Sequence, residues 1–128
     1  MDVAQALADL TEISSQIEQA VVVGEDGAVL GATFDGGEQL AEIAARLVRE
    51  AAGARGRDPN QLEAATHGGS VFVLRDGGRT IVATTVPAPT VGLVFYDLKS
   101  CLKSIGDAPK VRRRRAAKQT EDRPPDAA

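Results

Sequence analysis

The fold is decided in residues 19–54, which read QAVVVGEDGAVLGATFDGGEQLAEIAARLVREAAGA. The β-branched run at 19–24 predicts a strand that is covered on both faces. Asp26-Gly27 supplies the positive φ angles of a tight hairpin turn. A second strand follows, and alternation predicts that Val29 faces one side of the sheet and that the other side receives Leu30, Ala32 and Phe34.

The second half of this stretch, residues 38–54, keeps the apolar spacing of a helix, which Gly53 and the region of Gly56 are expected to end. Working outward, residues 2–17 predict a helix with Asp2 as its N-cap. Three short strands fit the remaining β-rich runs, at 62–67, 70–75 and 79–86, with glycine turns between them.

The segment 91–105 begins with the composition of a strand, but its apolar residues keep helical spacing over four turns after Thr90. We therefore predict a helix there, with Thr90 as N-cap. The resulting order is α-β-β-α-β-β-β-α. An α/β fold, with a five-stranded antiparallel sheet and helices on both faces, satisfies that order.

The length of 128 residues fits a single domain, which we place at residues 1–105. This body holds 14 acidic and 8 basic side chains, a net charge of -6, whereas residues 106–128 hold 4 acidic and 7 basic ones, a net charge of +3. The second segment is almost without apolar residues and predicts a disordered basic tail. An acidic body with only 3% aromatic residues argues against specific nucleic-acid binding.

The sequence lacks the constellations that catalysis or cofactor binding requires. There is one cysteine, Cys101, and one histidine, His67, so neither a disulfide nor a zinc site of the usual types is expected. No phosphate-binding loop occurs, and the glycines at 24, 27 and 31 fit a hairpin. His67-Gly68-Gly69-Ser70 is interpreted as a turn, because no nucleophile elbow accompanies it. We expect no catalytic residues, no metal and no cofactor, with Cys101 filling the core.

Neither a signal peptide nor a membrane-spanning run is recognisable, so a cytoplasmic location is expected, and the composition is typical of a GC-rich bacterial genome. The basic cluster is Arg112, Arg113, Arg114 and Arg115. It predicts at most a weak contact with anionic membrane, because no apolar or lipid anchor accompanies it. We favour a solvated, solubilising tail that loosely contacts the acidic body over this membrane contact.

The helix at 38–54 is the most informative segment because it carries two apolar arcs. The first is expected to lie on the sheet and consists of Leu40, Ile43, Ala44, Leu47, Ala51 and Ala54. The second is Ala41, Ala45, Val48 and Ala52, with Arg49 beside it. Small residues in a row permit close approach of another helix, so we predict that the second arc is an interface between two copies. The alternative is a deeply seated helix that is rich in alanine for its propensity.

Four segments carry a resemblance to a known family. They are IEQAVVVGEDGAVL at 17–30, LAEIAA at 40–45, Leu62-Glu63 at the start of a strand, and VGLVFYDL at 91–98. Together they resemble the roadblock (dynein light chain) domain of the bacterial kind, over residues 3–105 and in the same order. The arginine- and glycine-rich loop at 53–58 and the basic tail depart from that pattern.

The resemblance implies a non-catalytic homodimeric module that binds a Ras-like small GTPase and modulates its activity. It also implies dimerisation through the central helix and an edge strand, and it supplies no catalytic residue to carry over. The alternative from another class is a self-associating scaffold with no effect on nucleotide turnover.

Overall fold

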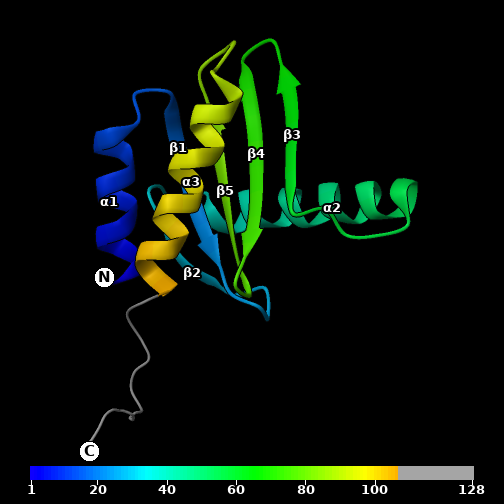
Figure 1. Cartoon of the computed structure of the whole chain (residues 1–128), viewed down its shortest axis with the longest axis horizontal. Helices are drawn as coiled ribbons and strands as arrows, with labels where there is room; N and C mark the ends of the chain where they lie inside the picture. Colours follow the sequence, from blue (N-terminus) through cyan, green and yellow to red (C-terminus); the bar gives the residue numbers. More distant parts are fainter. Residues whose placement is uncertain (107–128) are drawn as a thin grey trace, which may run out of the picture.

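The computed structural model describes residues 1–106, which form three helices around one five-stranded sheet (Figure 1). The helices are α1 (Val3–Ile13), α2 (Gly37–Arg55) and α3 (Val91–Gly106). The strands are β1 (Ile17–Val23), β2 (Val29–Ala32), β3 (Gln61–Thr66), β4 (Gly69–Asp76) and β5 (Arg79–Thr85). The predicted element order is confirmed, including the helix at α3. The predicted basic tail lies outside the described residues.

All neighbouring strands are antiparallel, in the order β2-β1-β5-β4-β3, so β2 and β3 are the edges. β1 and β5 are neighbours in the sheet although they are not consecutive in sequence. The β4–β5 hairpin turns through Gly77 and Gly78, with φ angles of +61° and +81° that side-chain-bearing residues rarely adopt.

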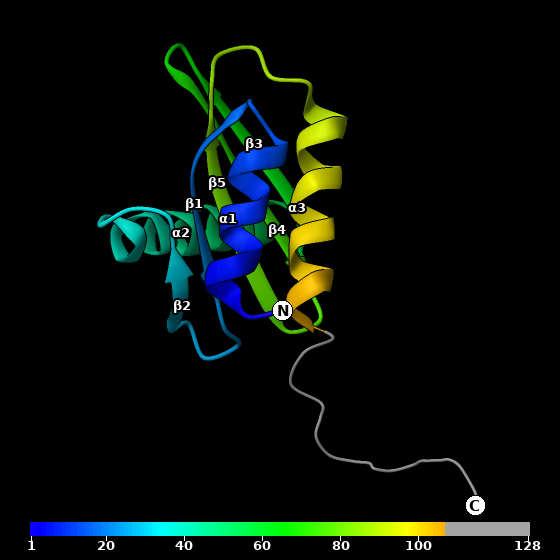
Figure 2. The ribbon, with the colours of Figure 1, turned by 90° about the vertical axis from the view of Figure 1, so that its left-hand side faces the viewer.

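The sheet has a helical layer on each side. Figure 2 shows α1 and α3 side by side on one face, and α2 on the other. The cluster under α1 and α3 contains the larger buried side chains, including Phe72, Ile81 and Leu98. Phe72 meets Phe95 of α3 edge to face, with ring centroids 4.9 Å apart. The cluster under α2 is smaller and is built mainly from valines of the central strands.

The first helix is shorter than predicted. Asp2 is its N-cap as expected, and its carboxylate accepts a hydrogen bond from the Gln5 backbone N–H at 2.8 Å. The helix ends at Ile13, however, because Ser14 has an extended backbone. Ile17, counted above as helical, is buried as the first residue of β1. Its spacing from Leu10 fits a helix, but both residues reach the same core from different elements.

The alternation predicted for β2 is wrong. A bulge separates the pairs Val22–Gly31 and Val23–Val29, so β2 carries one extra residue at Leu30. Val29 and Phe34 consequently pack against the cluster under α2, on the same side, and Leu30 is left 47% exposed. A strict period of two does not survive the insertion of one residue.

Candidate partner-binding surface

Helix α2 is long and alanine-rich, yet little of it is buried. Its only buried residues are Gly37, Leu40 and Ala44, all in its N-terminal half. It crosses behind the sheet and packs mainly on β1, β2 and β5, and its C-terminal end extends beyond β3 (Figure 1). The C-terminal half therefore carries apolar side chains that the described part of the chain does not cover.

The rotation of α2 differs from the predicted one. The side facing the sheet is Gly37, Leu40, Ala44 and, half-buried, Ala41 and Val48. Ile43, which was expected on the sheet, is 43% exposed. Gly37 lies close to the sheet, since an added Cβ would stand 2.7 Å from the Ala32 Cβ and 3.4 Å from Val21. The absence of a side chain at Gly37 permits this side of the helix to approach the sheet.

Four of the five predicted interface residues are brought together in a groove between α2 and the sheet. The groove encloses about 280 Å³, and α2 contributes Ala41, Ala44, Ala45, Val48 and Arg49 to it. Its opposite wall comes from Thr80 and Val82 of β5 and Arg75 of β4. Ala52, the fifth predicted residue, is half-buried and does not line this groove.

The flank of α2 opposite this groove was not recognised from the sequence. Ala45 and Arg49 line the groove together with Arg75 and Thr80, and helical spacing puts Ile43 and Leu47 on the other flank of α2. We infer that this flank lies toward the opposite end of the strands. There the register places half-buried Ala64 of β3 opposite half-buried Val71 of β4. We call this set of residues the α2–β3 surface: Ile43, Leu47, Ala64 and Val71.

The α2–β3 surface lies beside an open sheet edge. Strand β3 pairs with β4 on one side and with no other strand of residues 1–106. An edge strand presents backbone N–H and C=O groups that pair readily with a second strand. Ile43 and Leu47 are the sequence signal that could have revealed this surface, because both are large apolar residues on one flank of the helix. The apolar periodicity instead assigned both residues to the core.

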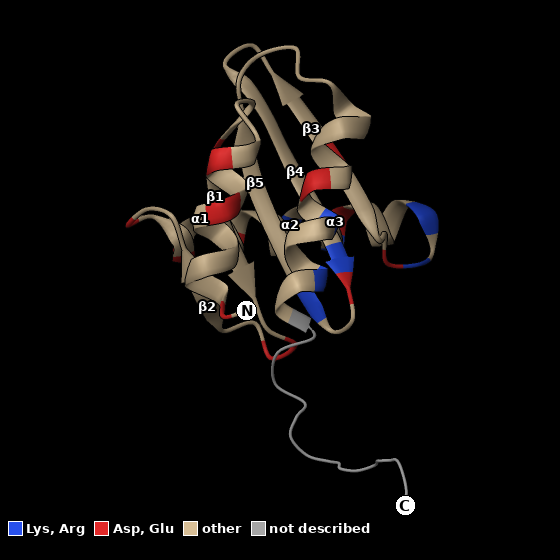
Figure 3. Ribbon diagram, turned by 60° about the vertical axis from the view of Figure 1, so that its left-hand side comes forward, with Lys and Arg blue, Asp and Glu red and all other residues tan. Residues whose placement is uncertain are grey.

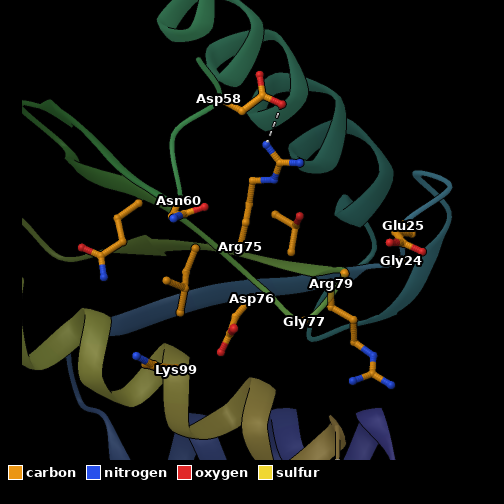
Figure 4. A pocket seen from close by; sticks show the side chains of 13 residues that line it. Gly24, Glu25, Asp58, Asn60, Arg75, Asp76, Gly77, Arg79 and Lys99 are labelled. Carbon is orange, nitrogen blue, oxygen red and sulfur yellow. Dashed lines mark ion pairs between the residues drawn. The ribbon is translucent and has the colours of Figure 1, made fainter. Parts of the chain in front are cut away.

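A second hollow lies at the end of the sheet near the β4–β5 turn (Figure 4). This open cleft of about 760 Å³ is polar, and its charged lining is Glu25, Asp58, Arg75, Asp76, Arg79 and Lys99. Arg75 pairs with Asp58 at 3.3 Å, which ties the loop after α2 to β4. Because three carboxylates are matched by three cations, the cleft offers no strong preference for an ion of either sign.

The described residues assemble no recognisable catalytic or metal site. Within residues 1–106 no three His, Cys, Asp or Glu side chains gather as metal ligands. His67 is exposed in the β3–β4 turn, and Ser70 is buried and donates a hydrogen bond to the Glu63 carboxylate at 3.0 Å. The turn interpretation of this segment is confirmed, since His67 and Gly68 form the turn between Thr66 and Gly69, which pair across β3 and β4.

Cys101 fills the core beside α1, as predicted. Its thiol donates to the Ala6 carbonyl at 3.6 Å, and burial, with a smaller effect of the Asp9 carboxylate, raises the pKa of the thiol to about 11. A thiol with so high a pKa holds its proton at neutral pH and is a poor nucleophile.

Among the helices of residues 1–106, none combines the length and apolar character that a membrane crossing requires.

Comparison with solved structures finds this fold in several proteins. The Roadblock/LC7 domain from Streptomyces avermitilis superposes with a TM-score of 0.71 at 20% identity, covering 83% of this chain and 96% of that one. MglB from Myxococcus xanthus gives 0.66 at 15% identity, covering 80% and 84%. An MglB structure with a tetrameric arrangement gives 0.68 at 11% identity, also covering 80% and 84%.

Sequence comparison adds nothing to this, because no family model and no curated protein matches the chain. The similarity is therefore one of architecture: a β2-β1-β5-β4-β3 sheet, two helices on one face, and one long helix on the other. The chain has the fold of a roadblock domain.

Proposed function

We propose that the chain is a homodimeric regulatory module that binds a Ras-like small GTPase and modulates its activity. The observation that carries the proposal is the shared fold with Roadblock/LC7 and MglB structures, combined with an uncovered apolar surface at α2 and β3.

The α2–β3 surface is the proposed contact between two copies. Ile43 and Leu47 provide the apolar centre, and β3 provides an edge that a second β3 extends by backbone hydrogen bonds. The same surface patch on both copies is what a two-fold dimer needs. The tetrameric arrangement reported for one MglB structure supports assembly through this fold.

Sedimentation at tens of micromolar tests the dimer. We expect Ile43→Arg to dissociate it, because a long charged group is placed in a desolvated contact at a cost of several kcal/mol. Ile13→Arg is the matched control, since Ile13 is 74% exposed on α1, across the sheet. A monomeric wild type, or a dimer that survives Ile43→Arg, would remove the α2–β3 surface from the proposal.

Binding to a GTPase is tested with the full chain as bait. Proteins retained from the native cell extract are identified by mass spectrometry, and a retained GTPase is purified and loaded with GDP or a non-hydrolysable GTP analogue. We expect at least tenfold tighter binding to one nucleotide state, and a change in the rate of phosphate or nucleotide release. Equal binding to both states with unchanged rates would favour the alternative, a self-associating scaffold.

The location of the protein and its membrane contact complete the proposal. We propose a cytoplasmic protein whose segment 112–115, with its four arginines, contacts anionic membrane only weakly. Co-sedimentation with vesicles rich in phosphatidylserine tests this contact. The bound fraction is expected to be small at 0.15 M salt and to fall further as salt rises.

A further inference from the structure

The outer side of the α1 and α3 layer carries a groove whose charge is not balanced. It holds about 150 Å³, and both helices line it with small apolar groups and with one carboxylate each. The apolar part comes from Ala6, Leu10, Ile13 and Cys101, and the carboxylates are Asp9 and Asp97. No Lys or Arg is among the described residues that line it, in contrast with the polar cleft of Figure 4.

The acidic character extends beyond the groove along α1. Asp2 and Glu12 lie on or next to the same helix, and residues 1–16 contain no Lys or Arg. Figure 3 shows acidic positions on both helices, and basic positions on α3, at the ends of β4 and β5 and at the C-terminal end of α2. The two lysines of α3, Lys99 and Lys103, are not among the residues that line the groove. The groove is therefore the place on this face where a cationic segment finds negative charge without a competing cation.

The chain itself continues from the end of this groove. Helix α3 runs opposite to α1 and ends at Gly106, and Met1 and Ser104 line the groove together at that end (Figures 1 and 2). Beyond Gly106 the sequence reads DAPKVRRRRAAKQTEDRPPDAA, in which Arg112–Arg115 stand between Lys110 and Lys118. The sequence segment with the four arginines thus follows the end of the groove that holds Asp9 and Asp97, and neither carboxylate pairs with a Lys or Arg of residues 1–106.

The reach of this segment matches the groove. Asp97 stands nine residues before Gly106, which is roughly 13 Å along a helix that rises 1.5 Å per residue. Arg112 stands six residues after Gly106, and an extended chain of that length spans roughly 20 Å. Six residues are therefore long enough to bring the arginines back to the level of Asp97, if residues 107–112 were to run along α3. The tether also raises their effective concentration at the groove, to the millimolar range for a short linker.

We propose that the groove between α1 and α3 is a binding site for the chain's own basic segment, residues 110–118. Asp9 and Asp97 receive the arginine guanidinium groups, and the apolar floor accepts Val111 or the arginine methylenes. In the bound arrangement the arginines face α1, so an anionic surface must displace them from the groove before it binds them.

The test compares amide chemical shifts of the full chain by NMR at low salt, about 0.01 M. In the tail variant, Arg112, Arg113, Arg114 and Arg115 are replaced by Gln. We expect the amides of Asp9, Ile13 and Ser100 to shift relative to wild type, and those of Glu42 and Glu50 on α2 to stay in place. Raising the salt of wild type to 1 M, where the Debye length is about 3 Å, should move the groove amides toward the positions of the tail variant.

A matched control removes the same charge elsewhere. Arg46, Arg49, Arg55 and Arg57 are exposed residues of α2 and its following loop, and their replacement by Gln should leave the groove amides unchanged. A second variant, Asp9→Asn with Asp97→Asn, should abolish the effect of the tail. Asn at position 9 keeps an oxygen to accept from Gln5 Nε2, which donates to Asp9 at 2.9 Å.

Three outcomes would overturn the proposal. The first is that tail neutralisation leaves the groove amides unmoved. The second is that it moves amides on both faces of the sheet equally, which indicates nonspecific attraction to the acidic body. The third is that the shift differences shrink in proportion on tenfold dilution, which assigns the contact to a second copy of the chain rather than to the same one.

Discussion

The two faces of the sheet are covered to different extents. The face under α1 and α3 packs two helices over aromatic and branched side chains, and Phe72, Ile81 and Leu98 are inaccessible to solvent. The opposite face has one helix, which buries three residues and leaves Ile43 and Leu47 at its flank. Stability therefore resides mainly in the first face, and the second face is the one with apolar surface left for a partner.

Truncating one side chain on each face measures this difference. We expect Phe72→Ala to lower the free energy of unfolding by about 3–5 kcal/mol, because a fully buried aromatic ring leaves a cavity. Val48→Ala, at a half-buried position under α2, should cost about 1 kcal/mol. Urea denaturation at low protein concentration supplies both values. Similar costs on the two faces would refute the unequal cores.

The reactivity of the Cys101 thiol measures how well the face under α1 and α3 excludes solvent. Its pKa near 11 lies two units above the ordinary value of 9.0, so we expect about 100-fold slower alkylation near pH 8 than for an unfolded thiol. Since the folded state retains the proton between pH 9 and 11, the free energy of unfolding should fall as pH rises through that window. Cys101→Ala should remove that part of the pH dependence. Rapid alkylation of the native protein would contradict the burial.

A pair of substitutions tests which flank of α2 forms the dimer contact. Leu47→Arg alters the α2–β3 surface, whereas Ala45→Arg alters the groove that contains most of the predicted interface residues. We expect Leu47→Arg to weaken the dimer at least tenfold more than Ala45→Arg, measured by sedimentation equilibrium. The reverse order would return the interface to Ala41, Ala45, Val48, Arg49 and Ala52.

Substitution of Gly53 is expected to have the smallest effect on stability, and to raise rather than lower the free energy of unfolding. It lies in the exposed C-terminal half of α2, and an added Cβ meets nothing within 4 Å. We expect Gly53→Ala to stabilise the fold by about 0.5–1 kcal/mol, because alanine loses less backbone entropy in a helix. A thermal melt with Gly69→Ala as contrast checks it, since a Cβ at Gly69 would collide with the Thr85 backbone oxygen. Destabilisation by Gly53→Ala would mean that this turn of α2 is packed after all.

Local patterns were sufficient for the element order. The valine run of β1, the paired glycines between β4 and β5 and the apolar spacing of α3 each specify a local conformation through short-range sterics and periodicity. They also indicated the roadblock architecture and Cys101 as a core residue. The end of α1 and the bulge of β2 were missed, because Ile17 and Leu30 suit several registers and only packing partners choose among them.

The candidate surface depended on the tertiary structure. Alanine and leucine on α2 fit the core and an interface equally well, so periodicity left the rotation of the helix open. In the folded protein Gly37 lies close to Ala32 and Val21, Ile43 is turned outward and Val48 inward. The groove between α1 and α3 likewise joins Asp9 to Asp97 across most of the chain. Sequence specifies conformation over a few residues, whereas a surface is made by contacts between elements that are distant along the chain.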